Sequence, residues 1–200
     1  MNERSKGEVT AEKIMRAAQE GFAQNGYAAT GVAEICASAG VSKGAFYYHF
    51  ESKQSLFMAL VEAWLGELEG SLAQVAEGVQ PVPERLLAMS RLMTGLFSSD
   101  VVQISIFFEF WMQAGRDAAV HAAVIAPYYH FQRFFAELLQ RGIDEGSLSA
   151  IDPVLGAQGI ISLASGLLLQ RLLDPEGADW GRLLESSMQL LLEGLRKVES

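Results

Sequence analysis

Apolar residues recur along most of the chain at intervals of three and four positions, which is the period of an amphipathic α-helix. No segment shows the sustained alternation of apolar and polar residues that is typical of a half-buried strand. Glycine and proline fall in the gaps between the periodic runs, where they would end or separate helices. The pattern therefore predicts an all-α fold of about nine helices.

Short polar residues stand before each of the first four periodic runs. A Ser or Thr at such a position can cap a helix, because its hydroxyl accepts a hydrogen bond from a free N–H of the first turn. Gly26 follows the first run and predicts its end. The predicted caps and helices are Thr10 with 11–25, Thr30 with 31–39, Ser42 with 43–50, and Ser52 with 53–77.

The segment GVQPVP, residues 78–83, is the clearest linker. Beyond it, segment 104–115 is apolar on every face, which is typical of a helix buried on all sides. Pro127 interrupts a helical pattern, where it either kinks that helix or begins a new one. Asp152 and Asp179 are predicted caps of the last two helices. The predicted helices after the linker are 83–97, 101–114, 118–142, 153–173 and 180–198.

The net charge of −9 at pH 7 argues against a general affinity for nucleic acid. The charge is unevenly distributed, however, because residues 1–55 hold six Lys or Arg and six Asp or Glu. The whole acidic excess therefore lies in the rest of the chain. This distribution leaves the N-terminal part free to approach a polyanion.

The single cysteine, Cys36, excludes an internal disulfide and fits a reducing compartment. We expect it to be a small buried residue where two helices cross, rather than a redox sensor. The polar N-terminus lacks the apolar stretch of a secretion signal, and segment 154–169 is short for a membrane span and predicts a buried helix. We therefore expect a cytoplasmic protein with no membrane partner.

The segment GVSKGAFYYHFESKQSL, residues 40–56, places four aromatic residues and a histidine in five consecutive positions. The turn Ala39-Gly40-Val41 before it joins two short helices, which is the geometry of a helix-turn-helix. An ordinary helical hairpin whose tyrosines cover a small core fits the turn and the period about as well. In the helix-turn-helix interpretation the core holds Ile35, Cys36, Val41, Phe46 and Phe50, and the outer face holds Lys43, Gly44, Tyr47, Tyr48 and His49.

The longer stretch GYAATGVAEICASAGVSKGAFYYHFESKQSL resembles the DNA-binding domain of the TetR (tetracycline repressor) family of bacterial transcriptional regulators. The resemblance covers residues 10 to about 57 and depends on the runs Ala-Gly-Val-Ser, Tyr-x-His-Phe and Ser-Lys-x-x-Leu. It implies a three-helix DNA-binding domain over 1–55 and a larger helical domain over 56–200 that dimerises and often binds a small molecule.

The same resemblance implies a set of DNA contacts, in part to base edges and in part to phosphates. Three positions depart from the family pattern: Gly31 and Ala45 lack hydroxyls that are common there, and Gln54 replaces the usual acidic residue. The implied base-edge contacts are Lys43, Gly44 and Ala45, and the implied phosphate contacts are Thr30, Tyr47, Tyr48, His49 and Lys53.

Methionine and aromatic residues gather around a few polar ones in the C-terminal part, which is the composition of an adaptable small-molecule cavity. For any one of them, plain core is the alternative. Glu109 lies among aromatic residues, so it must pair with Arg116 or Arg133, be protonated, or face a cationic ligand. The candidate ligand-binding residues are Met89, Met93, Phe107, Glu109, Phe110, Trp111, Gln113 and Tyr128.

Small residues and leucines dominate the last two predicted helices. The helix over 153–173 carries small residues that let a neighbour approach closely, and the last helix carries a stripe of leucines. Two such helices from each subunit would form a four-helix dimer interface, although burial within one subunit is the alternative. The small residues are Gly156, Ala157, Gly159, Ser162, Ala164, Ser165 and Gly166, and the stripe is Leu183, Leu184, Met188, Leu191, Leu192 and Leu195.

Together these features predict a homodimeric regulator, a repressor that binds a palindromic operator in double-stranded DNA and leaves it when a small apolar or cationic molecule binds. A helical small-molecule carrier and a DNA-binding regulator with no effector are the alternatives. We expect no enzyme, cofactor or metal site, because the sequence lacks a nucleophile elbow, a zinc-binding His pair and a phosphate loop, and holds only three histidines.

Overall fold

The computed structural model describes residues 6–98, 105, 108, 111–112, 114–115 and 117–195 of the 200-residue chain. Within these residues all regular structure is helical, which confirms the all-α prediction. The predicted helix over 101–114 lies mostly outside the described residues. The helices are α1 (Lys6–Ala29), α2 (Val32–Ala39), α3 (Lys43–His49), α4 (Lys53–Ala76), α5 (Val82–Ser98), α7 (Ala118–Asp144), α8 (Pro153–Leu173) and α9 (Trp180–Leu195).

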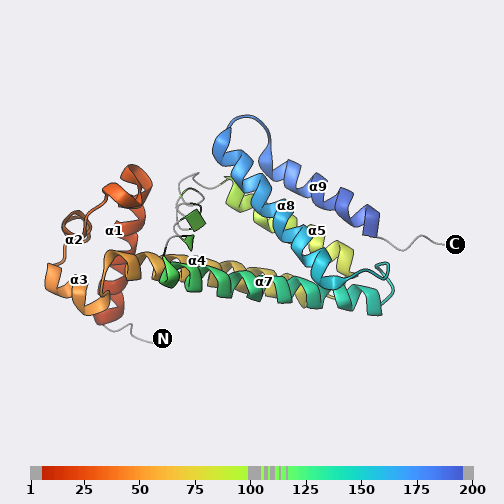
Figure 1. Cartoon of the computed structure of the whole chain (residues 1–200), viewed down its shortest axis with the longest axis horizontal. Helices are drawn as coiled ribbons and strands as arrows, with labels where there is room; N and C mark the ends of the chain where they lie inside the picture. The colour runs from red at the N-terminus through yellow and green to blue at the C-terminus, as the bar shows by residue number, and fades with distance from the viewer. Residues whose placement is uncertain are drawn as a thin grey trace.

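The helices form a small group at one end of the molecule and a larger group at the other (Figure 1). The small group contains α1, α2 and α3, and it lies at the N-terminal end. The long helix α4 leaves this group and runs through the molecule with α7 beside it. The remaining helices α5, α8 and α9 pack together over the distal part of α4 and α7.

Four of the predicted caps hold their helices as expected. Each side-chain oxygen accepts a hydrogen bond from a backbone N–H in the first turn, an interaction that typically contributes about 1 kcal/mol. The cap residues and distances are Ser42 to the amide of Ala45 at 3.1 Å, Ser52 to Ser55 at 3.0 Å, Asp152 to Val154 at 2.9 Å, and Asp179 to Arg182 at 3.0 Å.

The two predicted threonine caps are wrong, because both hydroxyls donate to carbonyl groups. Thr10 lies inside α1, which begins at Lys6, and its hydroxyl donates to the Lys6 carbonyl oxygen at 2.8 Å. Thr30 is fully buried, and its hydroxyl lies 2.9 Å from the carbonyl oxygens of both Gly21 and Gly26. The predicted break at Gly26 is confirmed, since its φ of 81° is not helical.

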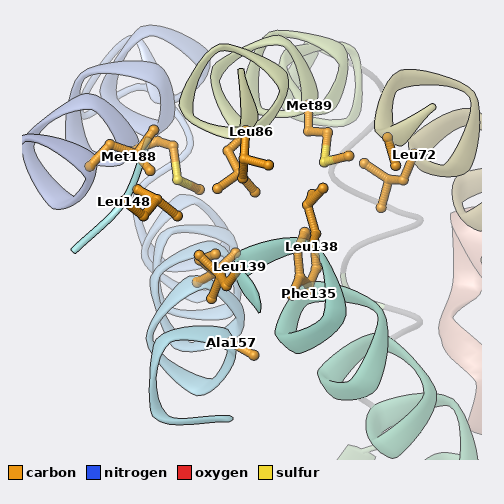
Figure 2. Packing of buried hydrophobic residues seen from close by; sticks show 13 residues of the cluster. Leu72, Leu86, Met89, Phe135, Leu138, Leu139, Leu148, Ala157 and Met188 are labelled. Carbon is orange, nitrogen blue, oxygen red and sulfur yellow. The ribbon is translucent and has the colours of Figure 1, made fainter. Parts of the chain in front are cut away.

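Two large hydrophobic clusters, and a smaller one between α8 and α9, form the interior of the described residues. The N-terminal core joins α1, α2, α3, the first part of α4 and the start of α7. The C-terminal core joins the end of α4 to α5, α7, α8 and α9, and Figure 2 shows its side chains converging from these helices. The N-terminal core contains Ile14, Ala17, Ala18, Phe22, Ile35, Cys36, Phe46, Leu56, Phe57, Val61 and Val120. The predicted burial of Cys36 is thereby confirmed.

A carboxylate fixes the linker after α4 to the loop between α7 and α8. Glu145 accepts hydrogen bonds from the Ser147 hydroxyl and the Val82 amide, both at 2.7 Å, and forms an ion pair with Arg85 at 3.2 Å. These contacts, the Ser147 hydroxyl first among them, hold the pKa of Glu145 below its ordinary value. The linker predicted at 78–83 is therefore anchored at its end.

The last helix uses most of its predicted leucine stripe inside its own subunit. Leu184, Met188 and Leu192 are buried, so their assignment to a dimer interface is wrong. Gly156 also serves internal packing, because a Cβ atom there would lie 2.7 Å from Leu139 of α7. Ala157 is fully buried for the same reason.

The helix α8 is only partly buried, which corrects the prediction of a buried helix over 154–169. Its length and mean hydropathy would suffice for a membrane span, yet just 22% of that apolar window is buried in one chain. The exposed apolar side chains on α8 and α9 are Val154, Leu155, Leu169, Leu173, Leu183 and Leu190. Both helices therefore carry exposed apolar side chains in addition to polar ones.

Candidate nucleic-acid interface and interior cavity

The turn between α2 and α3 has the helix-turn-helix geometry. Gly40 adopts the left-handed conformation, with φ 66°, and its amide donates to the Ala37 carbonyl oxygen at 3.2 Å. The next amide, that of Val41, donates to the Cys36 carbonyl oxygen at 3.0 Å, which satisfies a second free carbonyl at the end of α2. Ser42 then caps α3 directly, so the orientation of α3 is fixed by local contacts.

One face of α3 is anchored in the core and the opposite face is open to solvent. Phe46 is fully buried, and Phe50 packs against the same core, as predicted. Tyr47 and Tyr48 are 54% and 83% exposed, an unusual placement for large aromatic rings. The α3 sequence therefore divides its rings between the core and a surface.

The structure brings four of the predicted DNA-contacting residues together on this surface. Lys43, Gly44, Tyr47 and Tyr48 are all exposed, and their spacing of four residues places them on one side of α3. His49 is half-buried, and its ring lies edge-on to Tyr48 with centroids 5.0 Å apart. This surface offers an ammonium group and phenol hydroxyls, which are the donors that phosphates and base edges accept.

Ala45 lies at the edge of this surface. Its side chain is half-buried, and its amide donates to the Ser42 cap. Only a methyl group is available there for contact with a ligand.

Two predicted phosphate contacts have other roles in the structure. Thr30 is fully buried beneath α1, so its hydroxyl does not reach the surface. The Lys53 ammonium lies 2.7, 3.4 and 3.0 Å from the carbonyl oxygens of Tyr27, Ala28 and Thr30, and 4.3 Å from the Tyr27 ring centroid. Because an ammonium has three N–H donors, these carbonyls use all of them. Lys53 thus clamps the end of α1 to the start of α4.

An apolar cavity of about 130 Å³ lies between α4, α5, α7, α8 and α9, and Trp111 also lines it. Its lining includes five aromatic residues and many aliphatic ones, and none of the described lining residues is charged. The Ser90 hydroxyl at its edge already donates to the Leu87 carbonyl oxygen at 2.8 Å. The walls therefore offer contact area and few polar groups, which suits an apolar ligand.

Four of the eight predicted ligand-binding residues line this cavity: Met89, Met93, Trp111 and Tyr128. The other four, Phe107, Glu109, Phe110 and Gln113, lie outside the described residues. Pro127 also lines the cavity, and because α7 is a single helix across it, the alternative of a new helix at Pro127 is wrong.

The cavity residues that α4 and α8 contribute were not predicted from the sequence. From α4 these are Val61, Trp64, Leu65, Leu68 and Leu72, and from α8 they are Ile160, Ile161, Ala164, Ser165 and Leu168. Trp64 was the available signal, since a large ring in the middle of a long helix needs a partner surface. Which surface it faces follows only from the pairing of α4 with α7.

The part of the chain that the structure describes shows no candidate metal site. Those residues contain no group of three or more His, Cys, Asp or Glu side chains that could hold a metal ion.

Comparisons with protein-family models match both parts of the chain. Residues 14–60 match the model described as bacterial regulatory proteins, tetR family. Residues 81–195 match the model described as BetI-type transcriptional repressor, C-terminal. The second match alone covers more than half of the chain.

The chain is also similar to individual proteins over most of its length. It is 27% identical to the uncharacterized HTH-type transcriptional regulator YfiR of Bacillus subtilis over 88% of this chain and 86% of that protein. The crystal structure of a transcriptional regulator FadR from Bacillus subtilis in complex with stearoyl-CoA has a TM-score of 0.81 and 21% identity, over 92% of this chain and 99% of that one.

A regulator from Saccharomonospora viridis, in complex with choline, has a TM-score of 0.82 and 17% identity, over 94% and 98% of the two chains. At these identities, the two structural similarities show a shared fold.

Proposed function

The chain belongs to the TetR family of bacterial transcriptional regulators, and from this premise we propose that it is a homodimeric repressor whose palindromic operator is released when an apolar molecule fills the cavity. The observation that carries the proposal is that α4 and α7 both border the cavity and both reach the N-terminal core. Ligand binding and DNA binding therefore use the same two helices.

The exposed face of α3 supports the DNA contacts. Lys43 at its N-terminal end is the donor for a guanine edge, and the Ala45 methyl group suits a thymine methyl. Tyr47 and Tyr48 carry exposed hydroxyls for phosphate oxygens. Thr30 and Lys53 are not included, since both are occupied inside the protein.

The exposed apolar side chains of α8 and α9 support the homodimer. Leu155, Leu173 and Leu190 are 65%, 77% and 71% exposed, an arrangement that costs solubility in a monomer. The small residues Gly159 and Gly166 have open space beside them, so a partner helix can approach α8 closely. Binding to a palindromic operator then requires the two-fold axis to place the two α3 helices in successive major grooves, about 34 Å apart.

The uncharged lining supports an apolar effector. Burial of each methylene group contributes about 0.8 kcal/mol, so affinity for a straight-chain compound should rise roughly fourfold per carbon until the cavity is full. The aromatic lining, with Trp64, Trp111 and Tyr128, could also hold a cation, but the described lining provides no carboxylate to neutralise it. Since double-stranded DNA is the partner, the protein works in the cytoplasm.

The test begins with in-vitro selection of random DNA on the purified protein, with the Lys43→Ala/Tyr47→Ala variant as control. We expect an inverted repeat that the control does not select. The complex is then titrated with 1-alkanols from hexanol to dodecanol, with choline as a cationic probe. Release that strengthens with chain length supports the proposal.

Three other outcomes contradict parts of it. Release by choline alone would make the effector cationic, and release by neither probe would favour a regulator with no effector. Alkanol binding without any selected DNA would instead indicate a helical carrier.

A further inference from the structure

A hydrogen bond joins the start of α4 to the start of α7. The Gln54 side-chain amide donates from Nε2 to Oδ2 of Asp117 at 3.1 Å, across 63 positions of sequence, in a partly buried location. Gln54 directly follows Lys53, whose ammonium clamps the end of α1. The residue pair 53–54 therefore contacts the DNA-binding domain on one side and α7 on the other.

Asp117 in turn sets the first turn of α7. Its Oδ1 atom accepts a hydrogen bond from the Val120 amide at 3.3 Å, and its carbonyl oxygen accepts one from the His121 amide at 2.9 Å. Val120 is fully buried in the N-terminal core, the cluster that also holds Phe46 of α3. The start of α7 is thus part of the structure that positions α3.

The next turns of the same helix line the cavity. Ala123, Val124 and Pro127 all belong to its wall, and they follow Val120 by only three to seven residues. At a rise of about 1.5 Å per residue, the cavity begins roughly 5 Å along the helix from Val120. A displacement of this part of α7 by a ligand therefore acts directly on Asp117.

We propose that Gln54 is a positioning residue, and that its hydrogen bond to Asp117 is the joint through which occupancy of the cavity changes the position of α3. The proposal rests on the proposed function, because it needs a cavity ligand that releases DNA. The apolar packing of Val120 keeps α7 from moving closer to α4 but allows the two helices to slide along each other. The hydrogen bond is directional, so it fixes the position of α7 along α4. With the joint broken, α7 moves without carrying α4 and α3.

The chemistry of the pair allows the joint to be broken and restored by charge-matched changes. In Gln54→Glu, two carboxylates face each other with no donor between them, so the bond is lost. In Gln54→Glu/Asp117→Asn, the introduced amide oxygen can still cap α7 while its NH₂ group donates to the carboxylate introduced on α4, which restores the bond in the reverse direction. Gln74→Glu, at an exposed position of α4, makes the same charge change away from the joint.

The experiment measures operator affinity with and without saturating 1-decanol, on the DNA obtained by selection. We expect the dissociation constant of the parent protein to rise at least about tenfold, within the range of roughly 5- to 150-fold typical of allosteric coupling. Gln54→Glu should reduce this rise to less than about threefold. The double variant and Gln74→Glu should respond like the parent.

A parallel series uses Ala164→Phe, which places a ring in the cavity wall of α8, as a permanent occupant in place of 1-decanol. Melting temperatures are recorded for every variant, because a purely structural role would lower stability and leave the ratio of the two affinities unchanged.

An unchanged ratio in Gln54→Glu, or no recovery in the double variant, would overturn the role of Gln54 and leave the proposed function intact. If neither 1-decanol nor Ala164→Phe raises the dissociation constant for the operator in the protein with native Gln54, the proposed function is overturned, and the role of Gln54 with it.

Discussion

The clamp formed by Lys53 gives a prediction that separates two roles for one residue. In Lys53→Met the side chain keeps its length and apolar stem but loses every N–H donor. The carbonyl oxygens of Tyr27, Ala28 and Thr30 then lose their shared partner, and the segment between α1 and α2 is no longer held to α4. We expect a less stable protein whose electrostatic contact with DNA is unchanged.

The size of the effect follows from the contact distances. Hydrogen bonds to a charged group contribute about 1.5–3 kcal/mol each, so the two short contacts at 2.7 and 3.0 Å provide roughly 3–6 kcal/mol. Ordering the lysine side chain costs up to about 2 kcal/mol, and a cation at a helix N-terminus costs about 0.3–1 kcal/mol. The middle of these ranges leaves a net loss of about 2 kcal/mol, or roughly 4–8 °C in melting temperature for a chain of this size.

Urea unfolding and calorimetry measure the loss of stability, with Lys13→Met on the exposed face of α1 as the matched control. The control should stay within about 0.5 kcal/mol of the parent. Operator binding is measured at several salt concentrations, because each lost phosphate contact reduces the slope of log K against log salt by about 0.9. A variant as stable as the parent whose slope falls by that amount per subunit would refute the clamp and restore the phosphate contact.

Four further substitutions test the proposed interface, a carboxylate, and a closely packed glycine against an open one. Leu190→Asp should weaken the proposed dimer by about 2–4 kcal/mol, or roughly 30- to 700-fold, because each copy loses the burial of a leucine that is 71% exposed in one chain. Sedimentation equilibrium measures the dissociation constant of the dimer, which would be unchanged if α9 lies outside the interface. Glu145→Gln should destabilise the fold at pH 7, because the Ser147 hydroxyl and its neighbours stabilise the ionised carboxylate and lower the pKa of Glu145. In urea unfolding, the difference in free energy of unfolding between the parent and the variant should shrink as the pH falls through that lowered pKa. Gly142→Ala should lower stability in thermal unfolding by about 1–3 kcal/mol, because its Cβ atom would lie 2.6 Å from the Leu148 side chain. Gly70→Ala, on α4 with open space beside it, should instead raise stability by about 1 kcal/mol, and equal effects of the two substitutions would refute the packing argument.

Local signals predicted the caps correctly only where the hydroxyl or carboxylate had no other partner. Ser42 and Asp152 each face the free amides of the turn that follows, and the structure confirms both. Thr30 also has a hydroxyl group and stands before a helix as Ser42 does, yet it lies under α1 and donates to the carbonyl oxygens of Gly21 and Gly26. A pattern along the chain does not reveal that choice, because the competing acceptor comes from the packing of another helix.

The same limit applies to both candidate sites. The outer face of α3 was predictable, because a seven-residue helix with Phe46 inside must place Tyr47 and Tyr48 outside. The cavity was predicted on the side of Met89 and Tyr128, whose residue types are typical of such walls. The contribution of α4 and the bond between Gln54 and Asp117 depend on how helices distant in sequence pair, and amphipathic period alone does not specify this.

The position of the cavity fits the proposed control by a small apolar molecule. Along α4, Val61 belongs to the N-terminal core and Leu72 to the C-terminal core, and both border the cavity that lies between them. Along α7, Val120 and Phe135 stand in the two cores in the same way. Close-packed cores deform little, so a molecule entering the gap changes the angle between them more readily than their shapes. In the proposed homodimer through α8 and α9, that change of angle would move α3 relative to the two-fold axis and so alter the distance between the two α3 helices, which must match the spacing of the operator half-sites.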